Sequence, residues 1–246
     1  MIPHDSLALL LLVLVAGAAG LARGFSGFGA ALIFMPSASA LITPAVAAPV
    51  LLLVDNVLAT ALLPRAWQAA SRHEVAIMAA GALVGVPLGT LVLNHADPLM
   101  LRWIIAAVAA SMLALLVSGW RYAGTPRPGI TMGVGTISGL FGGLAQLSGP
   151  PVVAYWLTGH GNAGTIRSNI ILFFGATSIL STISYAVSGL ITREALMLAL
   201  ILGPLYGLGL YAGSRLFGLA SEVLFRRLCY ALIAISVIAS LPVWRG

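Results

Sequence analysis

One apolar run follows another along almost the whole chain, and this succession limits the possible folds more than any other feature. Most runs are roughly 20 residues long, the length that an α-helix needs to cross a hydrocarbon core of about 30 Å. Only 7% of the residues are charged, whereas soluble domains carry about a quarter. The sequence therefore predicts an integral membrane protein, with apolar segments near residues 6–22, 27–42, 44–63, 75–93, 99–120, 129–147, 151–158, 166–190, 194–218 and 222–244.

Helices are the expected spanning form, because every backbone polar group inside a bilayer must find its partner within the protein. The breaks between runs are short, so residues 1–246 are expected to form one all-α, polytopic membrane domain with about eight transmembrane helices. The first run resembles the core of a secretory signal peptide. The preceding MIPHDS has neither Lys nor Arg, however, so we interpret this run as a retained membrane segment.

The formal net charge of +6 comes from arginines that stand mostly singly at the ends of apolar runs. This distribution is typical of loop charges that set topology, not of a nucleic-acid site. The histidines have no metal-ligand spacing and the chain has one cysteine, so we expect no metal, no cofactor and no intrachain disulfide. The arginines interpreted only as loop or headgroup charges are Arg102, Arg121, Arg127, Arg226 and Arg227.

The two halves of the chain repeat one pattern. A shift of 115 residues aligns RGFSGFGA with SGLFGGLA and places Pro36 on Pro151. With small insertions the match continues, and Glu74 then aligns with Glu194. A duplicated, transporter-like architecture follows, with repeat one over about residues 6–120 and repeat two over about 129–244.

Each repeat opens on a glycine-rich break that is followed by a proline. Such residues interrupt helices, and at membrane depth the freed backbone groups are tolerated only where protein or a water-filled cavity satisfies them. The helix N-termini at a break carry unpaired N–H groups and a partial positive charge, which suit an anion. Glycines could instead serve only close helix packing. Because the two breaks occupy equivalent positions, we favour a substrate site.

The predicted substrate site draws on both breaks. Arg23 is costly to bury alone, so it should contact the anion, pair with an acid or extend to the interface. Gln146 and Ser148 can donate hydrogen bonds to an oxyanion or to another helix. The full set is Arg23, Gly24, Ser26, Gly27, Gly29, Pro36, Gly139, Gly142, Gly143, Gln146, Ser148, Pro150, Pro151, Arg167 and Asn169.

Two further pairs of residues interrupt the apolar pattern. Asp55 and Asn56 lie in mid-segment, where a carboxylate is a functional hypothesis by default. They are our candidates for coupling transport to H⁺ or Na⁺; pairing with an arginine or a plain interhelical hydrogen bond are the alternatives. Tyr155 and Trp156 follow the second break and are typical of an interfacial aromatic belt.

The segments GTISGLFGGLAQLSGPPVVAYWLTG and GFSGFGAALIFMPSASALITPAVAA resemble the two repeat signatures of the sulfite exporter TauE/SafE family. The resemblance covers essentially the whole chain. It implies a small permease that exports sulfite, sulfonates or other organic anions, and a substrate or gating role for Arg167. The first repeat departs from the family pattern, because Phe28 separates Gly27 from Gly29 where adjacent glycines are common.

These features predict a secondary transporter that moves small anions across a bacterial cytoplasmic membrane by alternating access. The expected partners are the anion and membrane lipid, without nucleic acid, and homodimerisation is left open. A passive anion channel and a permease for a non-sulfur organic anion are the alternatives. An enzyme is not expected, because the chain has no HExxH motif, no paired carboxylates on one helix and no Cys/His pair near a break.

Two topologies are compatible with the sequence. If each break lies within one crossing, the arginines of the loops divide six to five. If the segments on both sides of a break cross or return, the halves are inverted and the arginines divide nine to three, with the termini outside. Residues 151–158 are too short to cross alone. We therefore expect eight crossings, with the breaks as half-helix or re-entrant hairpins at mid-depth, and we treat the inversion as a hypothesis.

Overall fold

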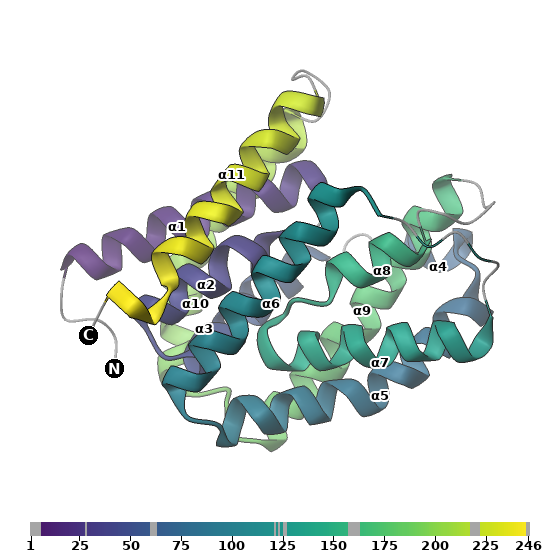
Figure 1. The fold of residues 1–246 in the computed structure, drawn as a ribbon, viewed down its shortest axis with the longest axis horizontal. Helices are drawn as coiled ribbons and strands as arrows, with labels where there is room; N and C mark the ends of the chain where they lie inside the picture. Colours follow the sequence, from purple (N-terminus) through teal and green to yellow (C-terminus); the bar gives the residue numbers. More distant parts are fainter. Residues whose placement is uncertain are drawn as a thin grey trace. The chain divides into compact units, whose positions relative to one another are not determined.

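The computed structural model describes residues 6–27, 29–59, 63–120, 122, 124, 127–156, 163–216 and 222–244. All regular elements in this part of the chain are helices, which confirms the predicted all-α class (Figure 1). They are α1 (Ser6–Ser26), α2 (Ala30–Leu41), α3 (Pro44–Ala59), α4 (Leu63–Ala69), α5 (Arg72–His95), α6 (Pro98–Ser118), α7 (Pro128–Ala145), α8 (Gly149–Trp156), α9 (Ala163–Val187), α10 (Arg193–Leu216), α11 (Glu222–Ser240) and the 3-10 helix η2 (Pro242–Trp244).

Five of these helices are long and apolar enough to cross a membrane. They are α1, α5, α6, α9 and α10, whereas α2, α3 and α11 contain shorter apolar stretches of 10–17 residues. Large apolar side chains such as Leu14, Leu91 and Leu200 are exposed on the long helices, as expected for surfaces that face lipid. The chain is therefore an integral, multi-pass membrane protein.

The predicted third run, residues 44–63, differs from the structure at its end. Helix α3 stops at Ala59, and Pro64 and Arg65 lie inside the short helix α4 instead of in a break. Proline is tolerated there because the first turn of a helix does not use its N–H groups for intrahelical bonds.

The chain forms two compact units, and each unit contains segments of both predicted repeats. Unit 1 consists of Met1–Val54, Ala96–Ala114 and Leu190–Gly246, so it holds α1, α2, α10, α11 and most of α3 and α6. Unit 2 consists of Asp55–His95 and Leu115–Gly189 and holds α4, α5, α7, α8 and α9.

In unit 1, glycines allow α1 and α10 to pack with their backbones in contact. A Cβ on Gly20 would overlap the Tyr206 carbonyl oxygen, and one on Gly24 would overlap that of Leu210. Contacting residue numbers rise together along both helices, so α1 and α10 run parallel. Small residues at such a contact are typical of helix pairs in membranes.

In unit 2, α5 and α7 pack in the same way and lie side by side (Figure 1). A Cβ on Gly135 would overlap the backbone of Met78, and one on Gly143 would overlap that of Val86. These two helices are therefore parallel as well. The third long helix, α9, packs against both of them.

The direction of α9 follows from hydrogen bonds near its two ends. Near its beginning, Asn169 Oδ1 accepts a 2.7 Å hydrogen bond from the N–H of Ser71, immediately before α5. Near its end, the Tyr185 hydroxyl donates to the Gly143 carbonyl oxygen at 2.8 Å, close to the end of α7. Helices α5, α7 and α9 of unit 2 thus all run in one direction.

Tyr155 and Trp156 are buried, so the prediction of an interfacial aromatic belt at these positions is wrong. They are 4% and 3% exposed and belong to a core cluster that also contains Phe173. The short helix α8 packs against both α7 and α9, and almost all of its side chains are enclosed as a result.

Candidate substrate-binding site

The first break lies in unit 1, between the end of α1 and the start of α2, as the sequence predicts. Gly27 and Gly29 have φ angles of 76° and 103°, in the left-handed region where a glycine has no Cβ to clash. The Leu32 N–H donates to the Gly29 carbonyl oxygen at 3.1 Å. The side chain of Ser26, a predicted site residue, lies outside the described part of the structure.

Arg23 lies in the last turn of α1 and is partly buried. Its Nη1 donates a hydrogen bond to the carbonyl oxygen of Gly27, within the break. A cation at this position also interacts favourably with the negative end of the helix dipole. Arg23 therefore holds the end of its own helix, and its charge lies at the break; contact with an anion stays a prediction.

Gly24 and Pro36 occupy different environments from the break itself. Gly24 is helical and faces α10, so close helix packing, the alternative weighed above, accounts for this glycine. Pro36 is buried inside α2, and the helix continues through it from Ala30 to Leu41. The interruption is therefore made by Gly27 and Gly29, and Pro36 does not end a helix.

The second break lies in unit 2, between α7 and α8, and its turning residue is Gln146. With φ 57°, Gln146 is the one non-glycine residue with a positive φ among those described. Its N–H donates to the Gly142 carbonyl oxygen at 2.8 Å, and the Leu147 N–H donates to that of Phe141 at 3.1 Å. The bond from Gln146 to Gly142 is that of an αL-type helix end, which usually places glycine at the left-handed position.

The Gln146 side chain joins this helix end to α9. Its Nε2 donates to the Gly142 carbonyl oxygen and to the Tyr185 hydroxyl, both at 3.1 Å. The fully buried Tyr185 hydroxyl in turn donates to the Gly143 carbonyl oxygen at 2.8 Å. Tyr185 is absent from the predicted site because it is distant in sequence. The available signal was a tyrosine inside an apolar run, since a buried tyrosine hydroxyl usually needs a partner.

The chain reverses direction at the second break. The Ser138 hydroxyl, in the middle of α7, donates to the Ser148 carbonyl oxygen. Further along, the hydroxyls of Thr131 and Tyr155 share a hydrogen bond of 2.5 Å, near the start of α7 and the end of α8. Helix α8 therefore returns along α7, and the two form a helical hairpin.

The start of α8 offers few backbone N–H donors, which weakens the prediction of an anion site at this helix N-terminus. Pro150 and Pro151 occupy its second and third positions, and proline has no N–H group. Only the N–H groups of Gly149 and Val152 are present in the first four positions. Gly142 lies against the Ser148 side chain, whereas Gly139 and Gly143 face the backbone of α5 and serve helix packing.

Arg167 and Asn169 lie on α9 but face different directions. Two residues along a helix correspond to about 200° of rotation. Arg167 is exposed, whereas Asn169 is buried. Asn169 Nδ2 donates to Glu74 Oε2 at 3.4 Å, so both ends of its amide bind the beginning of α5. The structure therefore gives Asn169 an interhelical role.

Asp55 and Asn56 lie near the end of α3 and are partly buried. Asn56 Nδ2 donates to Thr182 Oγ1 at 3.2 Å, which is the interhelical hydrogen bond weighed above as the alternative for this pair. The predicted residues of the first break thus lie in unit 1 and those of the second break lie around Gln146 in unit 2. Arg167 and Asn169 lie on α9 toward the end opposite to Tyr185, the partner of Gln146.

The sequence profile of the family described as "Sulfite exporter TauE/SafE" matches residues 12–240. The chain belongs to this family. The TauE/SafE match includes both breaks and all predicted site residues, and it confirms the resemblance found in the sequence.

A TauE/SafE relative from Cupriavidus necator covers almost the whole chain. It is described as "Probable sulfite/organosulfonate exporter TauE" and is 31% identical over 252 residues, which is 96% of this chain and 95% of the relative. No solved structure gives a significant match.

Proposed function

We propose that this protein is a secondary transporter of small sulfur anions, with sulfite and organosulfonates as substrates and export as the direction. The observation that carries the proposal is the alignment with a relative of that description over 96% of the chain. A bacterial cytoplasmic membrane is the expected location, because this relative is bacterial. Membership of a family of exporters also favours transport over catalysis.

The broken helices support a transport mechanism. Transporter sites are often formed where discontinuous helices meet, because unpaired backbone groups there can contact an ion. This chain has one break in each unit, at Gly27–Gly29 and at Gln146–Ser148. In the proposed mechanism the breaks provide backbone groups that bind the anion, and access alternates as one repeat moves relative to the other.

Helix directions in unit 2 support a half-length return at the second break, and the repeat extends this proposal to the first. If α7 and α8 formed a single crossing, α9 would run antiparallel to α5 after one further reversal. The hydrogen bonds of Asn169 and Tyr185 instead make α9 parallel to α5 and α7. We therefore propose eight crossings, made by α1, α3 with α4, α5, α6, α7, α9, α10 and α11, with α2 and α8 as half-length returns.

The same helices support inverted repeats. The end of α3 and the helix α4 run antiparallel to α9: Asn56 contacts Thr182, Leu63 contacts Gly175, and Ser71, just after α4, contacts Asn169. The α3–α4 segment and α9 occupy equivalent positions in the two predicted repeats. Equivalent elements with opposite directions are the signature of inverted-topology repeats. In this arrangement nine arginines face the cytoplasm and the termini lie outside.

Counterflow in proteoliposomes tests the proposed function. Vesicles loaded with unlabelled sulfite or ethanesulfonate should accumulate external labelled substrate transiently and saturably. A flux that does not saturate and shows no counterflow would indicate the passive channel. Counterflow of short carboxylates without that of sulfur anions would indicate a permease for non-sulfur anions.

A further inference from the structure

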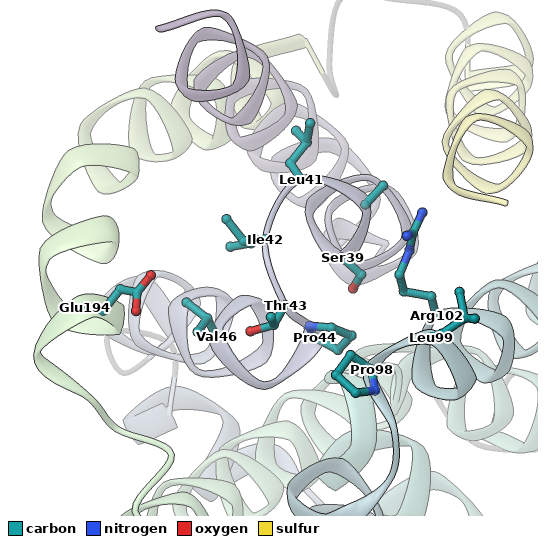
Figure 2. A pocket seen from close by; sticks show the side chains of 11 residues that line it. Ser39, Leu41, Ile42, Thr43, Pro44, Val46, Pro98, Leu99, Arg102 and Glu194 are labelled. Atoms are coloured by element: carbon teal, nitrogen blue, oxygen red, sulfur yellow. The ribbon is translucent and has the colours of Figure 1, made fainter. Parts of the chain in front are cut away.

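Unit 1 contains a cavity that is separate from the predicted site. Its volume is about 480 Å³, within the range of roughly 300–1,000 Å³ that is usual for small-molecule sites. It lies where α2 meets α3 and where α6 and α10 begin (Figure 2). Ser39, ten residues after Gly29, is about 15 Å further along α2 at 1.5 Å per residue. The cavity is therefore distinct from the first break.

A buried hydroxyl lines this cavity. Ser39 is 4% exposed, and its Oγ has no hydrogen-bond partner among the described residues. A buried polar group without a partner costs about 1–3 kcal/mol. A ligand atom in the cavity would remove this cost by accepting a hydrogen bond from Ser39.

Arg102 brings a permanent positive charge to the same cavity. It is partly buried in the first half of α6, and its Nη2 donates to the Ser240 carbonyl oxygen at 3.3 Å. Arg102 therefore lies in a helix and not in a loop. In the proposed orientation, Arg102 also lies on the outer side with only two other arginines, so the positive-inside rule does not explain it.

The rest of the lining suits a small organic anion. Leu41, Ile42, Val46 and Leu99 provide apolar walls, and the Thr43 hydroxyl lies between the two charged side chains (Figure 2). Glu194 is the second charge of the lining, and Figure 2 shows it well separated from Arg102. Because Coulomb interactions weaken with distance, an anion is favoured at the Arg102 end of the cavity and disfavoured near Glu194.

We propose that this cavity is an outer anion-binding vestibule for short-chain sulfonates. Arg102 and Ser39 donate hydrogen bonds to the sulfonate oxygens, and the carbon chain lies against the apolar wall around Leu99. The identity of the anion and the outer location rest on the proposed function. The vestibule would hold the anion on the outer side of the transport path, about 15 Å along α2 from the first break.

Ethanesulfonate binding to the purified full-length protein tests this proposal, with the ligand-induced shift in melting temperature as the readout. Arg102→Gln should weaken binding roughly tenfold or more, because a charge-assisted hydrogen bond is lost. Arg102→Lys should recover part of the affinity. Ser39→Ala should weaken binding several-fold without lowering the melting temperature of the unliganded protein, since this hydroxyl has no protein partner to lose.

Matched controls remove the same groups outside the cavity. Arg215→Gln deletes an exposed arginine that stacks on Tyr211, and Ser111→Ala deletes an exposed hydroxyl on α6. Both should bind ethanesulfonate like the wild type. Glu194→Gln should bind it more tightly, because a like charge is removed from the lining.

The vestibule is ruled out if folded Arg102→Gln and Ser39→Ala variants bind ethanesulfonate like the wild type. Weaker binding by Glu194→Gln would also contradict it. Thiol labelling tests whether the cavity opens on the outer side of the membrane. Thr43→Cys in a Cys229→Ser background should react with an impermeant thiol reagent from outside, and ethanesulfonate should protect it. If the wild-type protein shows counterflow but the variants bind ethanesulfonate unchanged, the vestibule is rejected and the transport function is retained. If ethanesulfonate binding depends on Arg102 but the protein shows no counterflow, the vestibule is retained and the transport function is rejected.

Discussion

At the scale of single residues, the second break depends on a side chain more than on glycine flexibility. Gln146 adopts a left-handed conformation that costs a non-glycine residue of order 1 kcal/mol or more. The bonds from its amide to Gly142 and Tyr185 offset that cost. The position and direction of the reversal therefore depend on Gln146 and Tyr185 together.

Tyr185→Phe should lower the stability of the protein by about 1–3 kcal/mol, because the Gly143 carbonyl and the Gln146 amide both lose a buried partner. Thermal unfolding in detergent is the measurement. Tyr211→Phe, at an exposed position on α10, is the control and should leave the melting temperature unchanged. A Tyr185→Phe protein as stable as the wild type would show that this network does not hold the break.

Asp55→Asn should abolish the dependence of uptake on a pH gradient while counterflow continues, if Asp55 carries the coupling proton. Counterflow needs only binding and alternation, whereas gradient-driven uptake needs the ionisable carboxylate. Asp97→Asn is a matched control, because Asp97 is an exposed residue whose side chain caps the start of α6. Unchanged gradient-driven transport in Asp55→Asn would exclude the coupling role.

At the scale of helices, glycines have two separate roles that look identical in the sequence. Gly27 and Gly29 adopt backbone angles that other residues rarely take, and they make the first break. Gly24, Gly139 and Gly143 are ordinary helical residues whose missing side chains let α1 approach α10 and α7 approach α5. The two kinds of glycine should therefore respond differently to substitution.

Gly143→Ala should destabilise the protein by about 1–3 kcal/mol, because the added methyl group would overlap the carbonyl oxygen of Val86 and separate two packed helices. Gly133→Ala, on the same helix, has open space at this position and should be neutral or slightly stabilising. Melting temperatures of the two variants in detergent decide the point. Equal melting temperatures would mean that α5 and α7 are not packed through this glycine.

At the scale of the whole molecule, the directions of the helices limit the possible membrane topologies. Each unit combines helices from both repeats, so neither repeat is a compact body by itself. Within unit 2, the parallel directions of α5, α7 and α9 require the chain to return between α7 and α9. The hairpin of α7 and α8 begins that return.

Single cysteines at Arg72 and Arg193, in a Cys229→Ser background, should be labelled from opposite sides of the membrane. Inverted repeats place the beginnings of α5 and α10 on different faces. Impermeant thiol reagents applied to right-side-out and inside-out vesicles provide the measurement. Labelling of both positions from the same side would contradict the inverted arrangement.

Much of the architecture can be predicted from the sequence because it depends on local properties. The length and hydropathy of the runs predict membrane helices, and the glycine clusters mark both breaks to within a few residues. Side-chain partners cannot be predicted in this way. Tyr185 and Asn169 are bonded to groups tens of residues away, and Tyr155 and Trp156 are buried because α8 folds back along α7.

The sequence by itself therefore determined the membrane class, the family resemblance and the positions of the breaks, since each depends on composition or short-range pattern. Only the tertiary structure decided how the breaks are built and where charge is placed. In the folded chain Gln146 is the turning residue, and Gly139 and Gly143 lie at a helix–helix contact. Arg102 and Ser39 line one cavity. The physical reason is that a hydrogen bond or a cavity joins groups through space, and the linear pattern of residues does not specify those distances.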